Sequence, residues 1–212
     1  MTLIAVTTQD SRNSAIMPTS GGLQSFSAGV TLPTSDLDYY TVSYRQKRYI
    51  PLSSTFTLAL KGDVGYGKAY GDTTTLPPWE NYFAGGIKTV RGFKDYSLGP
   101  RDSNEDPLGG NVKLVANAEI LFPAPFKLTE KTVRLSVFAD AGQVYDDEVD
   151  LGEIRYSTGA AFFWLSPFGA LGFSLAYPLN DKSGDDVEYF HIDIIFCRSL
   201  SVQIPGRGKG TD

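Results

Sequence analysis

Hydrophobic and polar residues alternate along most of this 212-residue chain. In residues 113–122 every second position is apolar: Leu114, Ala116, Ala118, Ile120 and Phe122. The positions between them include Lys113, Asn117 and Glu119. A period of two predicts a β-strand with one apolar face and one polar face. The same pattern predicts about nine strands in all, each of roughly ten residues, at 3–11, 22–32, 39–50, 55–68, 113–122, 133–142, 154–164, 171–177 and 190–196.

The connections between these segments are unequal. Residues 51–54 and 166–169 contain Pro or Gly and predict tight turns. The stretch at about 71–110 is much longer than the roughly 12–15 residues beyond which a structureless connection is unusual. Short turns at one end and longer loops at the other are typical of outer-membrane barrels. A soluble β-sandwich has the same alternation, so the pattern alone leaves both architectures open.

Composition narrows the classes of protein. Hydrophobic residues make up 42% and mean hydropathy is −0.15, so the chain contains no apolar run of about 20 residues and a transmembrane helix is excluded. A transmembrane barrel is not excluded, because its strands alternate. Aromatic residues, at 13%, suit a protein whose rings line two membrane interfaces. The net charge of −5 provides no basic stripe for phosphates, and we expect no nucleic-acid partner.

Candidate catalytic and metal-binding groups are few. The single Cys197 and single His191 exclude a disulfide framework and a clustered metal site. Asp140 and Glu119 could be a glycosidase pair of carboxylates, but any barrel supplies inward acids without a catalytic cleft. His191 falls on the inward face of the last strand and is expected to be a polar lumen residue, and residues 185–186 are expected in a solvated loop. We expect no catalytic residue, no cofactor and no metal.

Two short motifs carry the sharpest hypothesis. Val90-Arg91-Gly92-Phe93 lies within the long Gly-rich connection, and the segment Phe138-Ala139-Asp140-Ala141-Gly142 lies on a predicted strand. Arg91 and Asp140 can pair if the connection folds into a barrel, and a guanidinium suits this role because its planar fork bonds a carboxylate at two points. Glu119 is on the inward face of the preceding strand and could flank the same guanidinium. From spacing alone, a surface arginine in a flexible loop is the simpler interpretation.

In this order, the two motifs resemble those of the BamA family of outer-membrane insertases, within the surface-antigen/insertase superfamily, over roughly residues 20–194. The resemblance implies an all-β fold, the carboxy-terminal part of an antiparallel transmembrane β-barrel of about nine strands with a long lumen-inserted loop. It also implies that the VRGF tip docks on an inner-wall Asp. The implied loop lock consists of Val90, Arg91, Gly92, Phe93, Glu119, Phe138, Asp140 and Gly142.

The resemblance also implies a role for the last strand. In the family this strand forms a weakly paired lateral seam, here with Phe190, Ile192 and Ile194 facing lipid. The chain departs from the family pattern at Ile195, where the family usually has Gly, and at Arg198, where it ends in an aromatic residue. We therefore assign residues 1–198 to the barrel and 199–212 to a polar, flexible tail.

The beginning of the chain departs from the family as well. Its first residues lack a signal-peptide pattern, no POTRA domain is evident, and the family barrel has about sixteen strands. An open sheet in lipid would leave two unpaired edges. We therefore expect a carboxy-terminal piece of a longer protein.

The function implied by the resemblance is non-enzymatic assembly of β-barrel proteins in the bacterial outer membrane. The expected partners are the outer-membrane lipid bilayer, unfolded outer-membrane protein substrates and accessory lipoproteins of the assembly machinery. A TamA-type translocation factor or a two-partner-secretion exporter shares both motifs and is the alternative. A passive porin, a lipid-modifying barrel enzyme and a soluble binding module remain open.

Overall fold

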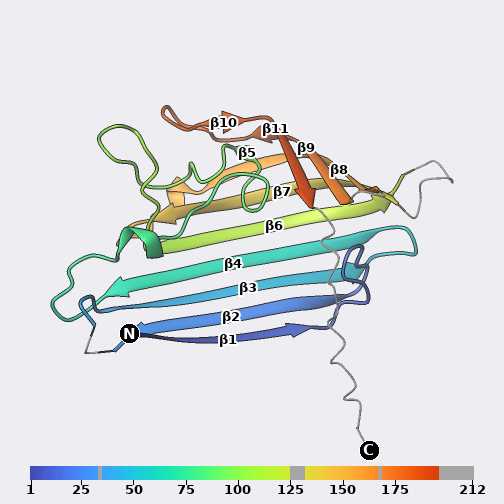
Figure 1. Cartoon of the computed structure of the whole chain (residues 1–212). Coiled ribbons are helices and arrows are strands. Elements are labelled where there is room, and N and C mark those ends of the chain that lie inside the picture. Colours follow the sequence, from blue (N-terminus) through green and yellow to red (C-terminus); the bar gives the residue numbers. More distant parts are fainter. Residues whose placement is uncertain (33–34, 125–131, 167–168, 196–212) are drawn as a thin grey trace, which may run out of the picture.

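Nine long strands form one antiparallel sheet in the computed structural model, which describes residues 1–32, 35–124, 132–166 and 169–195. The strands follow one another in chain order across the sheet (Figure 1). They are β1 (Thr2–Asp10), β2 (Gly21–Thr31), β3 (Tyr39–Pro51), β4 (Thr57–Ala69), β6 (Val112–Pro123), β7 (Val133–Tyr145), β8 (Arg155–Ser166), β9 (Gly169–Pro178) and β11 (Phe190–Ile195). The predicted all-β antiparallel fold is confirmed, and each predicted strand corresponds to one of these nine.

Four short elements lie outside the main sheet. Two single 3-10 turns are η1 (Pro78–Glu80) and η2 (Leu151–Glu153). Two-residue strands β5 (Gly92–Phe93) and β10 (Val187–Glu188) pair with each other. Among the residues that the structure describes, none of the helices has the length and apolar character needed to cross a bilayer. A two-residue strand is too short to show a period, so alternation could not predict β5 or β10.

The strands pair in continuous register, which brings polar positions of neighbouring strands together on one face. Asp140 on β7, for example, lies opposite Asn117 on β6 and Ser157 on β8. Figure 1 shows the sheet as a curved wall with the long β4–β6 connection against its inner face. The edges of the sheet, as far as it is described, are β1 and β11.

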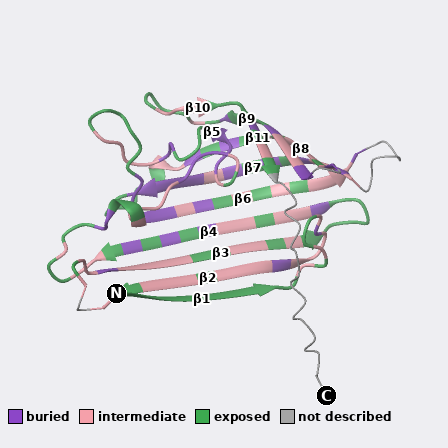
Figure 2. Ribbon diagram, viewed as in Figure 1, coloured by how far each residue is buried: buried purple, intermediate pink, exposed green. Residues whose placement is uncertain are grey.

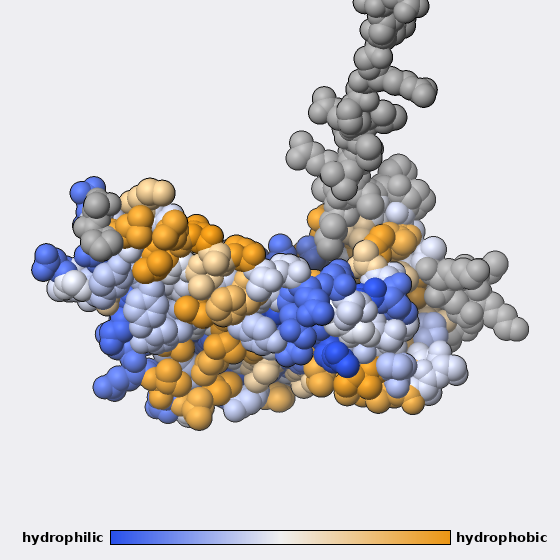
Figure 3. All heavy atoms as spheres, turned by 90° about the horizontal axis from the view of Figure 1, so that it is seen from below, coloured by the Kyte–Doolittle hydropathy of each residue, from blue (hydrophilic) through white to orange (hydrophobic). Residues whose placement is uncertain are grey.

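The two faces of the sheet have inverted polarity compared with a soluble protein. Figure 2 shows buried and exposed residues alternating along β4 and β6. The outward side chains are apolar and exposed, as at Leu60, Val64, Val137, Leu175 and Ile192, whereas buried polar side chains include Asp63, Lys113, Asp140, Arg155, Ser157 and His191. Seen from the β1 side, apolar side chains form broad patches separated by polar ones (Figure 3). Apolar outside and polar inside is the arrangement of a transmembrane barrel wall, and a soluble sandwich is excluded.

Aromatic rings gather near both ends of the strands. Toward the long loops, the rings of Tyr40 and Tyr66 lie 6.1 Å apart and those of Tyr177 and Tyr189 lie 6.3 Å apart. Toward the short turns, the ring pairs are Phe56 with Phe122 and Phe162 with Phe173, each 6.0 Å apart. Two aromatic bands flanking an apolar strip are the girdles expected at the two interfaces of a membrane.

The long connection is packed against the wall. A buried apolar cluster joins loop side chains to strands β6 and β7, and its members are Ala84, Val90, Phe93, Leu98, Val115 and Val144. Val90 and Phe93 are both 0% exposed. The inner side of the wall therefore carries a small buried apolar core, and this core fixes the loop tip against the polar inner face.

Candidate functional site

The loop tip is shaped by bonds within the loop and by bonds to the wall. Gly86 donates its backbone N–H to the Phe93 carbonyl oxygen at 2.9 Å, which closes the tip into a compact turn. A side chain at Gly86 would overlap the carboxylate of Asp95, so the turn requires Gly there. The side-chain nitrogen Nδ2 of Asn117 on β6 donates a hydrogen bond to the Thr89 carbonyl oxygen at 2.6 Å. The tip is thus held directly beside β6 and β7.

Arg91 forms an ion pair with Asp140 at the centre of the site. Its Nε donates to Oδ2 at 2.7 Å and its Nη2 to Oδ1 at 2.9 Å, a two-point contact. The backbone N–H of Arg91 also donates to Oδ2, at 3.1 Å. The Asp140 side chain is 0% exposed and that of Arg91 is 10% exposed. One carboxylate thus positions both the side chain and the backbone of the loop tip.

Two further wall residues contact the guanidinium. Oε2 of Glu119 lies 3.6 Å from Arg91 Nη1, and the hydroxyl of Ser136 donates a short hydrogen bond to Glu119. The ring centroid of Phe138 lies 3.4 Å from Arg91 Cζ, so the guanidinium is in contact with an aromatic face. The charge is therefore balanced by two acids, and the ring restricts its plane.

The environment of Arg91 keeps it charged. Burial opposes the positive charge, but the hydrogen bonds and negative charge of Asp140, with a smaller contribution from Glu119, outweigh it and hold the pKa of Arg91 above its ordinary value. The pair is thus an ion pair in a mostly desolvated place. Removing one member would leave the other charge buried without a partner.

The four other motif residues have steric roles. A Cβ on Gly142 would lie 2.9 Å from Val90 Cγ2 and 2.8 Å from the Leu114 carbonyl oxygen, so Val90 can pack there only against Gly. Gly92 has a φ of +93°, which favours Gly, and a Cβ there would lie 3.3 Å from that of Ser157. Phe93 lies in the apolar cluster already described. The structure thus brings all eight motif residues of the predicted loop lock into one region.

His191 is part of this site, which sequence reasoning missed. Its Nε2 accepts the backbone N–H of Gly92 at 3.0 Å, and the residue is 5% exposed. Alternation placed His191 on the inward face but gave no partner, because the partner is 99 positions away in a loop. The presence of a single inward imidazole on the last strand was the one available signal.

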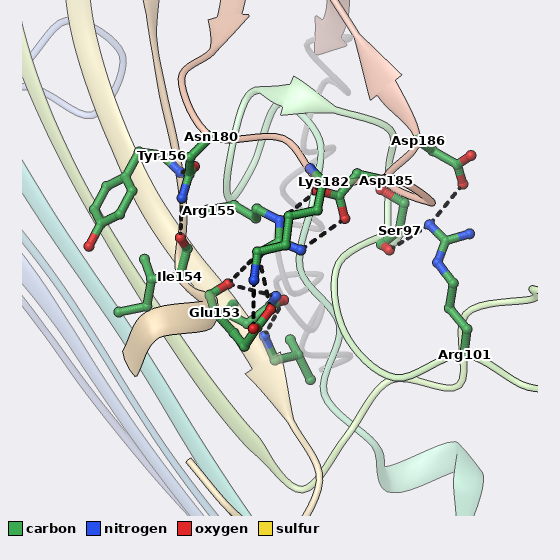
Figure 4. A network of polar contacts seen from close by, with 12 residues as sticks. Ser97, Arg101, Glu153, Ile154, Arg155, Tyr156, Asn180, Lys182, Asp185 and Asp186 are labelled. Carbon is green, nitrogen blue, oxygen red and sulfur yellow. Dashed lines mark hydrogen bonds and ion pairs between the residues drawn. The ribbon is translucent and has the colours of Figure 1, made fainter. Parts of the chain in front are cut away.

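A polar network ties the outer loops together (Figure 4). Arg155 Nε contacts Asp185 Oδ2 at 2.5 Å, and Lys182 Nζ contacts Glu153 Oε1 at 2.6 Å. The hydrogen bond from Lys182, with a contribution from Arg155, holds the pKa of the Glu153 carboxyl below its ordinary value. Residues 185–186 follow four exposed residues in this loop, and the side chain of Asp185 is in addition ion-paired and only 13% exposed.

Asp186, which follows Asp185 in the chain, contacts the long β4–β6 loop. Asp186 Oδ2 lies 3.1 Å from Arg101 Nη2 (Figure 4). The backbone carbonyl of the same residue accepts the N–H of Lys94 at 2.8 Å. The β9–β11 connection is therefore attached to the β4–β6 loop through both side chain and backbone.

The lumen beside the loop is polar and holds a cavity of about 600 Å³. On its wall, Asp63 is contacted by Arg45 Nη2 at 3.1 Å and Lys113 Nζ at 3.2 Å. Within the part of the chain that the structure describes, no group of three or more His, Cys, Asp and Glu side chains could hold a metal. The arrangement is suited to holding a loop in place by ion pairs and hydrogen bonds.

The last strand has one paired edge. β11 pairs with β9 from Phe190↔Leu175 to Ile195↔Ala170. Phe190, Ile192 and Ile194 point outward and are about half exposed. For the residues with described coordinates, no strand lies on the other side of β11. Cys197, Arg198 and the expected tail at 199–212 lie outside the described residues.

Comparisons with known proteins agree on one family. The model of the Omp85 superfamily domain matches residues 1–194. Outer membrane protein assembly factor BamA of Neisseria meningitidis serogroup B is 40% identical, over 86% of this chain and 27% of that protein. Sorting and assembly machinery component 50 homolog A of Xenopus laevis is 28% identical, over 84% of this chain and 41% of that protein.

A solved structure shows the same fold. It is the crystal structure of BamA from Haemophilus ducreyi lacking POTRA domains 1-3, with a TM-score of 0.84 and 32% sequence identity. The match covers 90% of this chain and 41% of that one. The chain thus spans less than half the length of each of these relatives.

Proposed function

Because this chain belongs to the Omp85 superfamily, we propose that it acts within an outer membrane protein assembly factor, which folds β-barrel proteins and inserts them into the bacterial outer membrane. Its location is the outer membrane, where the apolar outward side chains of the sheet contact lipid. The similarity to Neisseria BamA over most of the chain supports this function. The outer-membrane bilayer and unfolded outer-membrane proteins are its proposed partners, together with accessory lipoproteins.

The observation that carries the proposal is the Arg91–Asp140 pair inside the wall. Removing one partner of a buried ion pair typically costs about 3–5 kcal/mol, and less where water enters. A pair of this kind makes the loop a brace for β6 and β7. We propose that the brace keeps this part of the wall rigid while strands elsewhere open.

Among the described strands β11 is an edge of the sheet, and substrate strands would act there. An edge strand presents unpaired backbone N–H and C=O groups, and an incoming strand can add to them by β-augmentation. In this mechanism an edge strand receives substrate strands, and no covalent chemistry is needed.

Assembly is favoured over secretion among the functions that share these motifs. The Neisseria and Haemophilus relatives are BamA proteins, and the Xenopus relative is named as a sorting and assembly component. Similarity to assembly proteins from bacteria and from a eukaryote supports a function in assembling membrane proteins.

Complementation with the full-length gene tests the proposal. Cells depleted of the wild-type protein would carry Arg91→Glu, Asp140→Arg or both changes. Each single variant should lower the amount of folded outer-membrane barrels several-fold and lower the heat stability of the protein itself. The double variant should recover part of both, because it restores opposite charges in reversed order.

Lys94→Glu is the matched control, since it reverses a charge on an exposed side chain of the same loop. It should leave barrel assembly and heat stability unchanged. If depletion leaves the outer-membrane barrels at their normal level, the assembly function is overturned. If the double variant is no better than either single variant, direct pairing is overturned.

A further inference from the structure

We propose that His191 is a positioning residue that fastens the last strand to the loop tip, so that the loop lock sets the position of the edge strand as well as the wall. The inference rests on the proposed function for its consequence, because β11 is the strand at which substrate is taken to add. The contact itself stands on the structure alone.

The first observation is the hydrogen bond between His191 and Gly92. The imidazole Nε2 lies 3.0 Å from the Gly92 nitrogen, and both residues are buried. A buried backbone N–H requires an acceptor. Here a side chain of the last strand accepts this N–H, beside the pairing of Gly92 with Glu188 in β5–β10, whereas the neighbouring Arg91 N–H is accepted by Asp140. Two successive amides of the tip are thus directed at two different strands, β7 and β11.

The second observation is that the segment leading into β11 is bonded on both sides. On the lumen side, β10 pairs with β5, with Glu188 opposite Gly92 and Val187 opposite Phe93. On the wall side, the Ala176 N–H donates to the Tyr189 carbonyl oxygen at 2.8 Å. The chain therefore passes from the loop tip to the edge of β9 within residues 187–189, and His191 lies two residues further on.

The third observation is how little else holds β11. It has a strand partner on one edge only, among the strands that the structure describes. Among its described side chains, those that face inward are His191 and Asp193. His191 lies opposite Ser174 of β9 and reaches past it to the loop. His191 thus connects the inward face of β11 to the loop tip by a hydrogen bond.

Two substitutions can separate the hydrogen bond that His191 accepts from the volume that its side chain fills. An imidazole nitrogen accepts a hydrogen bond only when it carries no proton. Gln offers an amide oxygen at a similar reach and can accept, whereas Leu has comparable bulk and no acceptor. His191→Gln therefore preserves the tie and His191→Leu removes it while keeping the side chain's volume.

Hydrogen exchange in the full-length protein, reconstituted in phospholipid nanodiscs, measures the tie directly. In H191L the backbone amides of residues 90–94 should exchange about five- to tenfold faster, as expected from loss of one hydrogen bond. H191Q should stay close to the wild-type rate. Asp193→Asn, the next inward position of β11, is the control and should not alter exchange in the loop. Unchanged exchange in H191L would overturn the inference.

An engineered disulfide tests whether the role of His191 is to attach the last strand to the loop tip. Lys94→Cys with Asp186→Cys joins two segments whose backbones are 2.8 Å apart from N to O, in a Cys197→Ser background. In H191L this disulfide should restore both loop protection and outer-membrane barrel assembly, and a reductant should abolish the rescue. If H191L accumulates poorly, its recovery by the disulfide supports the tie, and absence of recovery overturns it.

The two proposals fail separately. Normal barrel assembly after depletion of the whole protein would overturn the assembly function, while the exchange result still reports on the His191 contact. Conversely, wild-type exchange and assembly in H191L would remove the positioning role and leave the assembly function intact.

Discussion

Arg91 is held by contacts that restrict it in different ways. The two bonds to Asp140, at 2.7 and 2.9 Å, set the direction of the guanidinium, and the Phe138 ring at 3.4 Å sets its plane. Glu119, at 3.6 Å and more exposed, contributes mainly charge. A lysine could not contact both carboxylate oxygens and also lie flat on the ring. The motif therefore specifies arginine by geometry as well as by charge.

Gly142, the last residue of the second motif, permits a test of how tightly Val90 packs against the wall. Gly142→Ala would bring a Cβ to 2.9 Å from Val90 Cγ2 and 2.8 Å from a backbone oxygen, so the loop tip must move. We expect a loss of about 1–3 kcal/mol in the free energy of unfolding, as for other overpacked sites. The measurement is denaturant unfolding of the full-length protein in micelles, followed by tryptophan fluorescence.

Gly62→Ala is the control for that substitution. Gly62 lies on β4, and a Cβ there would meet nothing within 4 Å. Its replacement should leave the unfolding free energy unchanged or slightly raised, because Ala restricts the unfolded chain. Equal effects of the two substitutions would contradict the tight Val90–Gly142 packing.

At the scale of elements, the outer loops are joined by charges. Arg155 at the start of β8 binds Asp185 in the β9–β11 connection, and Lys182 of that connection binds Glu153 (Figure 4). Asp185→Asn removes the charge from the more buried of these pairs. We expect trypsin to cleave after Lys182 about three- to tenfold faster in the purified full-length protein, because local opening becomes easier.

Asp181→Asn provides the comparison for this loop. Asp181 is exposed and has no ion pair in the described part of the chain. Cleavage after Lys182 should proceed at the wild-type rate in this variant. If Asp185→Asn behaves in the same way, the Arg155–Asp185 pair does not hold the connection closed.

At the scale of the whole molecule, the inverted polarity of the sheet predicts that the cost of a charged outward residue depends on its depth in the bilayer. Val137 points outward near the middle of β7 and is 48% exposed, whereas Tyr177 points outward near one end of β9. Arginine in place of Val137 should cost about 2–4 kcal/mol of folding free energy in a bilayer, and in place of Tyr177 only about 0–1 kcal/mol. Unfolding in phospholipid vesicles measures both.

The difference between the two substitutions is the informative quantity. A protein folded in water would tolerate both changes equally, since both side chains are exposed. Equal unfolding free energies in vesicles would therefore contradict the membrane orientation of the sheet.

Local pattern was enough to identify the strands and their faces, whereas the residues of the loop lock came from the resemblance of two motifs. A side-chain period of two depends only on neighbouring positions, so alternation placed Asp140 and Glu119 on the inner face without knowledge of the rest of the fold. The order of the strands followed because each pairs with the next in the chain. The pairing of Arg91 with Asp140 came from the resemblance of two motifs, because spacing alone favoured a surface arginine.

The contacts between loops required the folded chain. The bond from Gly92 to His191, the β5–β10 pair and the Arg155–Asp185 bridge depend on where irregular segments run, and irregular backbone has no period to reveal its path. In each case the partners lie far apart in the sequence and meet only when the sheet and its loops have folded. Short-range alternation therefore determines the wall, whereas the position of the last strand depends on contacts that exist only once the loop is inside.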